Sequence, residues 1–438
     1  MRTRRRASIL PQWLPFIGER LGFVRRLSTM SIDPEDFDLH HVFPATTSLG
    51  RLAGHTSEFE PRAGGAGVDL NEAVNSAMGE LLERYSAFAC RSIGKVVSTY
   101  REMERDRLKT VPFELLTQFS RRQLQTPGFP FTEFTVDTRI AWLRGVNLTT
   151  GSPSYVPSQL ISLGYAPEPD EISSCFYTTS SGCALGTSAE GALVSGLLEC
   201  IERDSVMVRW YARIAPPILD FDPSQLLGRR LRLQTKGLEI CFHDMTVDGE
   251  VPVVGVTCLE RSGRPCCFLL SAAAAIDTVA AARKALIEAG QGRPFIKILA
   301  NQEEAPTASC TFNDFDSNLR FFAEPSNAQY ADWFLQNRRL STRRFAAVPD
   351  SKNTIDLCDL LLKRCSNMGI TPIAFDLTTP ELRDYGLFVC RVFVPELVQV
   401  CVPFAPFLGH PRLANYIDEA QRNGLAASIP EWVPHPFP

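Results

Sequence analysis

Apolar residues recur at helical spacing in three long segments of the chain. The segments cover 69 to about 90, a stretch that begins near Thr187, and about 277 to 290, and each pattern predicts an amphipathic helix. Asp69 with Glu72, and Thr187 with Glu190, have the spacing of residues that cap helix starts. In the first helix the apolar residues Met78, Leu81, Leu82, Tyr85 and Ala89 lie opposite Glu80 on a helical wheel, so this helix is expected to bury that face.

Alternating apolar and polar residues predict strands between these helices. Residues 141–160 alternate and turn at Thr149-Thr150-Gly151, which is typical of a hairpin. Further strands are expected at 237–246, 251–260, 265–273, 371–377 and 387–400, whereas residues 96–138 combine helix and loop. Helices interleaved with hairpins indicate an α+β fold.

Composition excludes several classes of protein. The chain has 438 residues, 45% hydrophobic and 21% charged, with a net charge of −4, so it carries no general basic field for nucleic acid. No apolar run approaches the roughly 18 residues of a membrane span. The 13 cysteines contain no Cys-x-x-Cys pair and have no zinc-ligand spacing with the six histidines, which indicates free thiols in a reducing cytoplasm.

The first 30 residues differ from the rest of the chain. They hold seven arginines but one acidic residue, Glu19, a bias found in transit peptides, in solvated tails and upstream of misassigned start codons. We expect residues 1–30 to be a dispensable basic tail or a misassigned start before Met30. Residues 31–438 are then one domain that ends in a proline-rich tail, 430–438.

A four-residue pattern is repeated in the first two helices. Ser76-x3-Glu80-x2-Glu83-Arg84 reappears as Ser195-x3-Glu199-x2-Glu202-Arg203, and the third helix carries a relative, Glu288-x2-Gln291-x-Arg293. Glycine-rich segments, 64–67 and 180–186, precede the first two copies, and a segment of small residues precedes the third. The repeated unit is therefore a loop followed by a helix.

Two chemical interpretations of the repeat remain open. A Glu with an Arg four residues later is a common ion pair on an exposed helix. If instead Glu80, Glu83, Glu199 and Glu202 converge, four like charges need cations, and two Mg²⁺ ions would balance them. Arg84, Arg203 and Arg293 would then clamp phosphate oxygens. Because the chain has neither a P-loop nor the kinase signatures, the second interpretation predicts an unusual Mg-nucleotide site.

These residues resemble the YcaO family from about Gly64 to the C-terminus. The likeness lies in the paired Ser-x3-Glu-x2-Glu-Arg helices, in 181–186 and in 285–293. It implies a YcaO-type fold, with repeated loop–helix units and mixed or antiparallel sheets around an ATP/Mg²⁺ site that activates peptide amides. By this resemblance the four glutamates are metal ligands, and the nucleotide is surrounded by Ser76, Arg203, Gln291 and Arg293.

The chain departs from the usual family pattern at three positions. Ala66 stands where a lysine is frequent and Ser181 where an asparagine is frequent, and Gly191 replaces a common glutamate, with Glu190 one position away. These departures concern individual nucleotide contacts rather than the site as a whole.

The sequence ends in a Pro-x-Pro-x-Pro pattern, Pro434 to Pro438. Such an end is either a disordered polyproline segment or a stiff one that delivers its terminal carboxylate to a fixed point. Within YcaO proteins it resembles the azoline-forming cyclodehydratases, so the Pro438 carboxylate is the expected catalytic base. The implied reaction is ATP-dependent cyclodehydration of Cys, Ser or Thr in a ribosomal peptide. Thioamide or amidine formation, and a non-catalytic ATP-binding scaffold, are the alternatives.

Partners follow from the same resemblance. The chain has no obvious additional domain for a leader peptide, which implies a ribosomal precursor peptide as substrate and a leader-binding, ThiF-like partner protein. We also expect a flavin-dependent azoline dehydrogenase as a partner and a homodimer of this chain within a larger complex. No binding to nucleic acid or to a membrane is expected.

Overall fold

The strands of the computed structural model form three antiparallel sheets within the described residues. These residues are 11–18, 22–30, 33, 36–46, 63–89, 95–167, 170–172, 174–227, 238–260, 268–300, 314–345, 353–426 and 433–437. The first sheet has the order β1 (Val24–Thr29), β2 (His40–Thr46), β3 (Gly65–Gly67). The second has the order β4 (Val96–Ser98), β5 (Ile140–Asn147), β12 (Ile373–Asp376), β13 (Phe388–Phe393), β7 (Cys183–Gly186), with β6 (Pro153–Pro157) paired to β5. The third has the order β11 (Phe268–Ala274), β10 (Val253–Glu260), β9 (Leu238–Asp244), β8 (Ile218–Leu219).

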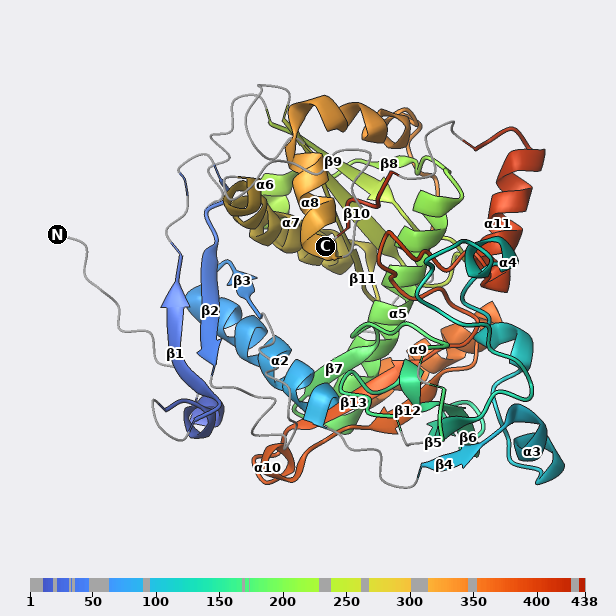
Figure 1. The fold of residues 1–438 in the computed structure, drawn as a ribbon. Coiled ribbons are helices and arrows are strands. Elements are labelled where there is room, and N and C mark those ends of the chain that lie inside the picture. The colour runs from blue at the N-terminus through green and yellow to red at the C-terminus, as the bar shows by residue number, and fades with distance from the viewer. Residues whose placement is uncertain are drawn as a thin grey trace.

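Three long helices connect these sheets around the middle of the molecule (Figure 1). They are α2 (Leu70–Ala89), α5 (Ala189–Tyr211) and α7 (Thr278–Ala300). Each pair of helices contacts a shared strand: α2 and α5 contact β7, α5 and α7 contact β11, and α7 and α2 contact β3. All three helices thus border one central region, and the α+β prediction is confirmed.

Shorter helices cover the periphery. They are α3 (Tyr100–Arg105), α4 (Arg121–Leu124), α6 (Pro223–Leu226), α8 (Phe315–Ala323), α9 (Thr354–Met368), α10 (Pro380–Arg383) and α11 (Pro411–Arg422). The 3₁₀ helices are η1 (Pro11–Phe16), η2 (Phe113–Leu116), η3 (Ser158–Leu160) and η4 (Pro325–Leu335). None of the helices in the described part of the chain combines the length and the apolar character that a membrane span requires.

The sequence pattern places the long elements well and their ends less well. Asp69 caps α2 as predicted, since its Oδ1 accepts a hydrogen bond from the Glu72 amide at 2.9 Å. The predicted Thr187 cap of α5 is wrong by one residue, because the Ser188 side chain accepts from the Gly191 amide. Helix α7 is longer than predicted and continues beyond Pro294 to Ala300. Strand β13 is shorter than predicted and ends before Pro395, which lacks the amide hydrogen that a ladder needs.

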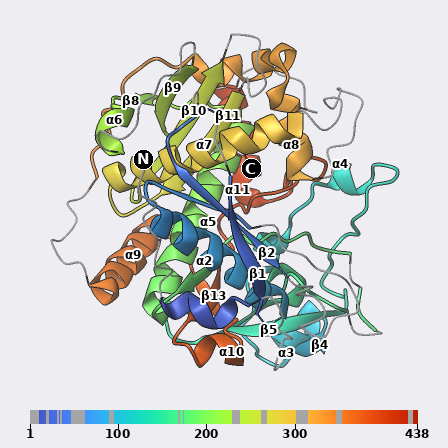
Figure 2. The same cartoon turned by 90° about the vertical axis from the view of Figure 1, so that its left-hand side faces the viewer.

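Packing of α2 follows its predicted apolar face. Met78, Leu81, Leu82 and Tyr85 are buried, whereas Ala89 is only half-buried. The three-stranded sheet lies over this helix, as Figure 2 shows in a view from the side of the sheet. Burial of four large side chains stabilises this layer by roughly 1.5–3 kcal/mol each.

The expectation of a solvated tail before Met30 is wrong for the described part of it, 11–18 and 22–30. Trp13 and Phe16 are buried with exposed fractions of 3% and 1%, and the Trp13 indole N–H donates to Asn75 Oδ1 at 2.7 Å. Strand β1 pairs with β2 along its length. The arginine-rich composition of residues 1–30 hid this packing, because the apolar residues of 11–24 form only a short pattern beside it.

Candidate functional site

The two loop–helix units have the same local geometry. The Gly64 amide donates to Glu80 Oε2 at 2.8 Å, and the Gly182 amide donates to Glu199 Oε2 at 2.9 Å. In each unit the glycine-rich loop therefore holds the first glutamate of the helix that follows. The duplication seen in the sequence is a duplication of structure.

Glycine is required in both loops. Gly182 has φ +81°, and a Cβ there would lie 2.1 Å from the Val392 carbonyl oxygen. A Cβ on Gly65 would lie 2.2 Å from the Ala73 carbonyl oxygen. No larger residue fits either position without moving backbone, so the first loop sits directly against α2, and the second against β13 and Cys200 of α5.

Each first glutamate also pairs with the arginine one turn later. Arg84 lies 2.7 Å from Glu80, and Arg203 lies 3.2 Å from Glu199. The common helix ion pair of the first interpretation is therefore present. It does not describe the whole arrangement, because the second glutamate of each helix belongs to the same group of charges.

The acidic groups of α2 and α5 interact with one another electrostatically. Burial, with the negative charges of Glu199 and Glu80, raises the pKa of Glu83 well above its usual range. Burial also raises the pKa of Glu199, with Glu202 adding to the rise and Arg203 opposing it. Glutamates from two helices thus share one region in which negative charge is not fully balanced.

Helix α7 adds two charged residues that the sequence prediction did not include among the site residues. The Lys284 ammonium lies 3.5 Å from Glu202 and 3.7 Å from Glu288. Burial raises the pKa of Glu288 to about 7, with Lys284 opposing and Glu202 adding to the shift. Glu202 itself accepts from the Ala274 amide of β11 at 3.1 Å. The spacing of the repeat held a signal for Lys284, which precedes Glu288 by four residues, as Ser76 precedes Glu80.

The predicted nucleotide residues divide into two groups. Gln291 lies beside the first loop, with its Nε2 3.5 Å from the point that a Cβ on Gly64 would occupy, and Ser76 is exposed on α2. Arg293 is instead 1% exposed and forms ion pairs with Asp36 and Glu260, each at 3.3 Å. The structure therefore brings Gln291 to the repeated units and places Arg293 in a separate buried cluster.

The carboxylates are not arranged as a finished metal cage. Among the residues that the structure describes, no three His, Cys, Asp or Glu side chains converge as a metal-binding group. Arg203 and Lys284 occupy the space beside Glu202 instead, at 3.6 and 3.5 Å. Hard carboxylate oxygens with unbalanced charge suit Mg²⁺, which keeps several non-protein ligands, so the residues fit Mg²⁺ after a local rearrangement.

The C-terminal segment packs against this site. Residues 433–437 are buried, and the Phe437 ring lies under the Arg203 guanidinium, 4.6 Å from its centre. His435 Nε2 donates to the Cys401 carbonyl oxygen at 2.7 Å. The alternative of a disordered polyproline end is wrong for 433–437, whereas Pro438 lies outside the described residues.

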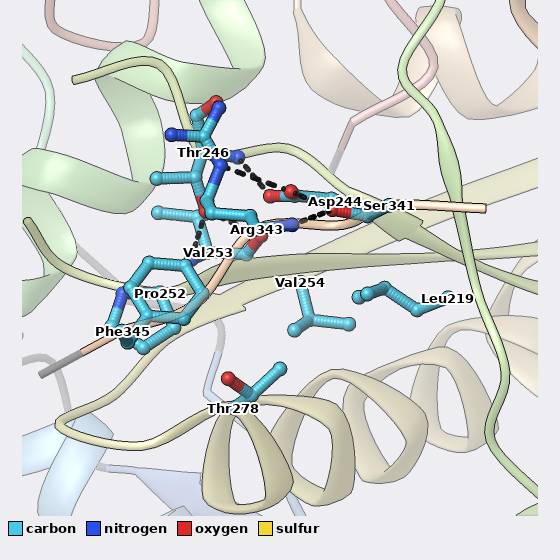
Figure 3. Close-up of a pocket in the computed structure, with 10 residues that line it drawn as sticks. All are labelled: Leu219, Asp244, Thr246, Pro252, Val253, Val254, Thr278, Ser341, Arg343 and Phe345. Atoms are coloured by element: carbon cyan, nitrogen blue, oxygen red, sulfur yellow. Dashed lines mark hydrogen bonds and ion pairs between the residues drawn. The ribbon is translucent and has the colours of Figure 1, made fainter. Parts of the chain in front are cut away.

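A small cavity elsewhere in the molecule has a different character. It lies against β9 and β10 and is lined by Asp244, Arg343 and Ser341 among others (Figure 3). Asp244 is ion-paired with Arg343 at 3.1 Å and accepts from Ser341 at 2.6 Å. None of the repeated glutamates lines this cavity, so it is separate from the candidate site.

Comparison with protein families shows which family the chain belongs to. The sequence model of a family described as "YcaO cyclodehydratase, ATP-ad Mg2+-binding" matches residues 64–398. The chain belongs to the YcaO family. It is accordingly an ATP-dependent enzyme of a Mg²⁺-binding cyclodehydratase family, and the matched region begins at the first loop glycine and contains every glutamate of the site.

Solved structures share the fold at low sequence identity. A heterocyclase in complex with substrate and cofactor is 20% identical with a TM-score of 0.72, over 97% of this chain and 56% of that one. YcaO from Methanopyrus kandleri bound with AMPPCP and Mg²⁺ is 20% identical with a TM-score of 0.59, over 86% of each chain. The E. coli microcin synthetase McbBCD complex with pro-MccB17 bound is 14% identical with a TM-score of 0.58, over 85% of this chain and 88% of that one. This YcaO chain therefore matches little more than half the length of the first heterocyclase.

One relative is closer in sequence. An uncharacterized protein of Methanothermobacter thermautotrophicus is 26% identical over 344 residues, which cover 76% of this chain and 80% of that protein.

Proposed function

We propose that this YcaO chain converts Cys, Ser or Thr residues of a ribosomally synthesised peptide to thiazolines or oxazolines at the expense of ATP. The observation that carries the proposal is the pair of loop–helix units whose glutamates share one region. In the reaction a thiol or hydroxyl attacks the preceding amide carbonyl. The attack closes the ring, and the oxygen of this cyclic adduct takes the γ-phosphoryl group of ATP, which leaves ADP. Loss of that oxygen as phosphate, together with the proton of the amide nitrogen, forms the C=N bond of the azoline.

The acidic groups of α2 and α5 are the proposed metal ligands. Glu80, Glu83, Glu199 and Glu202 would hold Mg²⁺, which neutralises charge on the transferring phosphoryl group when bound. The raised pKa of Glu83, caused by burial and by the charges of Glu199 and Glu80, supports this assignment, because such a site gains the most from a divalent cation.

Residues around the glutamates are the proposed nucleotide contacts. Arg203, Gln291, Ser76 and Arg84 border the two loops, and the guanidinium groups suit bidentate contact with phosphate. Arg293 is also kept as a proposed nucleotide contact, and its ion pairs with Asp36 and Glu260 hold its guanidinium in place.

The buried tail favours cyclodehydration over the thioamide and amidine alternatives. Phe437 stacks on Arg203, so the backbone that leads to Pro438 is held beside a proposed phosphate-binding residue. In this proposal the Pro438 carboxylate removes the proton of the attacking thiol or hydroxyl. We keep 31–438 as the YcaO domain, with the correction that residues within 11–18 and 22–30 pack onto it.

The partners of this chain form the last part of the proposal. Its fold is shared with the E. coli microcin synthetase McbBCD complex, which was solved with pro-MccB17 bound. By that analogy we assign to it a ribosomal precursor peptide, a leader-binding ThiF-like protein and a flavin-dependent azoline dehydrogenase, with a homodimer inside the complex. The described cysteines are free thiols, which suits a cytoplasmic protein.

Mass spectrometry tests the proposal directly. A candidate precursor peptide is incubated with this chain, a leader-binding partner and MgATP, and each ring formed should remove the mass of one water with release of one phosphate. Glu83→Gln serves as the matched inactive variant. Sulfide-dependent mass gain would instead support the thioamide alternative, and peptide-independent ATP binding without phosphate release would support the scaffold.

A further inference from the structure

Lys284 occupies an unusual position in the acidic site. Its ammonium group lies between Glu202 of α5 and Glu288 of its own helix, at 3.5 and 3.7 Å. The Glu202 side chain is 2% exposed, so its charge depends on neighbouring groups for balance. Lys284 therefore supplies a counter-charge from a different helix to a carboxylate that the proposed function assigns to Mg²⁺.

The repeat explains why Lys284 reaches this point. In α2 and α5 a serine stands four residues before the first glutamate, at Ser76 and Ser195. In α7 the same offset before Glu288 is occupied by Lys284. The third unit thus places a cation where the other two place a hydroxyl group.

The second cation beside Glu202 is held more firmly. Arg203 lies 3.2 Å from Glu199 and stacks on the buried Phe437 ring, and its side chain is 21% exposed. The Lys284 side chain is 52% exposed, and both of its contacts are longer than the 2.7–2.9 Å or so of a strong charged hydrogen bond. Lys284 can therefore withdraw into solvent at lower cost than Arg203.

A divalent cation and Lys284 compete for the same oxygens. Mg²⁺ needs carboxylate oxygens at about 2.0–2.1 Å, and Glu202 Oε2 already interacts with Lys284 and the Ala274 amide. We propose that Lys284 is an internal counter-ion that holds Glu202 in the metal-free protein and is displaced when Mg²⁺ binds. This inference rests on the proposed function, because it takes Glu202 as a metal ligand.

Mg²⁺ binding without nucleotide is the measurement that tests it. Lys284→Met removes the charge and keeps most of the side-chain stem, and Lys284→Arg keeps the charge. Arg283→Met is the matched control, since Arg283 is the preceding residue of α7, loses the same charge, and is paired with Glu72 at 2.9 Å. Each protein is treated with a chelator and titrated with MgCl₂ by calorimetry, with thermal unfolding followed in parallel.

If Lys284 is displaced when Mg²⁺ binds, removing its charge should increase the affinity of the protein for Mg²⁺. Lys284→Met should bind Mg²⁺ about tenfold or more tightly than the parent, within the usual range for coupled sites. Its metal-free form should melt at a lower temperature and recover most of the loss when Mg²⁺ is added. Lys284→Arg and Arg283→Met should bind Mg²⁺ as the parent does. Equal or weaker affinity in Lys284→Met, or no Mg²⁺ binding to any of the four proteins, overturns the inference.

A second titration separates this inference from the proposed function. The parent protein is titrated with Mg²⁺ and AMPPCP together. If it binds the Mg²⁺–AMPPCP complex while Lys284→Met gains no Mg²⁺ affinity, the counter-ion inference alone fails. If the parent does not bind the complex, the nucleotide site and the proposed function fail.

Discussion

The buried imidazole of His435 makes the packing of residues 433–437 dependent on pH. His435 is fully buried, and burial lowers its pKa from 6.5 to about 4, although its contacts with the Cys401 and Phe437 backbone oppose the shift. Folding therefore favours the neutral ring. The resulting stability is complete above about pH 6.5 and is lost as the pH falls toward 4.

The size of the effect follows from these two values. At pH 5 nearly every unfolded chain carries the proton, but only about one folded molecule in ten does, which costs about 2 kcal/mol relative to neutral pH. His435→Gln removes the titration and retains a side chain that can donate to Cys401. We expect this variant to lose about 2 kcal/mol less unfolding free energy than the parent between about pH 7.5 and pH 5.

Urea unfolding followed by circular dichroism at the two pH values measures the difference. Other buried histidines, such as His243 and His410, titrate alike in both proteins and cancel in the comparison. His40→Gln is the control, since His40 is exposed on β2, and it should follow the parent. Identical pH dependence in His435→Gln and the parent would refute the reasoning, because the imidazole would then be free to take a proton where it lies.

Three further changes test the site and the two ends of the chain. Glu83→Gln or Glu202→Gln should weaken binding of Mg²⁺–AMPPCP by at least about tenfold in calorimetry while the thermal unfolding temperature stays close to that of the parent; unchanged binding in both would exclude them as ligands. One glycine added after Pro438 moves the terminal carboxylate by up to about 3.5 Å and should slow peptide cyclisation about tenfold with nucleotide binding retained; a full rate would remove the carboxylate from the reaction. A protein that starts at Met30 should lose several kcal/mol, roughly the cost of deleting one large core side chain such as Trp13, and parental stability in urea would show that 11–29 adds nothing.

Local patterns predicted the elements that carry the site. The apolar stripe of α2, the two glycine-rich loops and the repeated glutamates are all encoded within short segments, so helical spacing and turn chemistry were sufficient to find them. The hydrogen bonds from the loop amides of Gly64 and Gly182 to Glu80 and Glu199 occur at equivalent positions of the repeat. Fold class was predicted correctly for the same reason, because it needs only the order of elements.

Contacts between distant segments were not predictable in this way. Arg293 pairs with Asp36, 257 residues earlier, and Lys284 of α7 reaches Glu202 of α5, a different helix. Periodicity carries no information about which helices face each other, so neither the ion pairs of Arg293 nor the position of Lys284 beside Glu202 could be predicted. The burial of Trp13 was missed because seven arginines in its segment dominated a short apolar pattern.

The strand order of the second sheet has a consequence for how quickly the protein folds. Strand β7, at Cys183–Gly186, pairs with β13, at Phe388–Phe393, and α2 and α5 both rest on this pair. The two strands are separated by roughly 200 residues of chain, and closing such a long loop before they can pair slows folding. Until β7 and β13 pair, α2 and α5 lack the sheet surface on which both pack, so their acidic residues cannot come together. We therefore expect refolding to be slow, with the acidic site forming only after β7 joins β13.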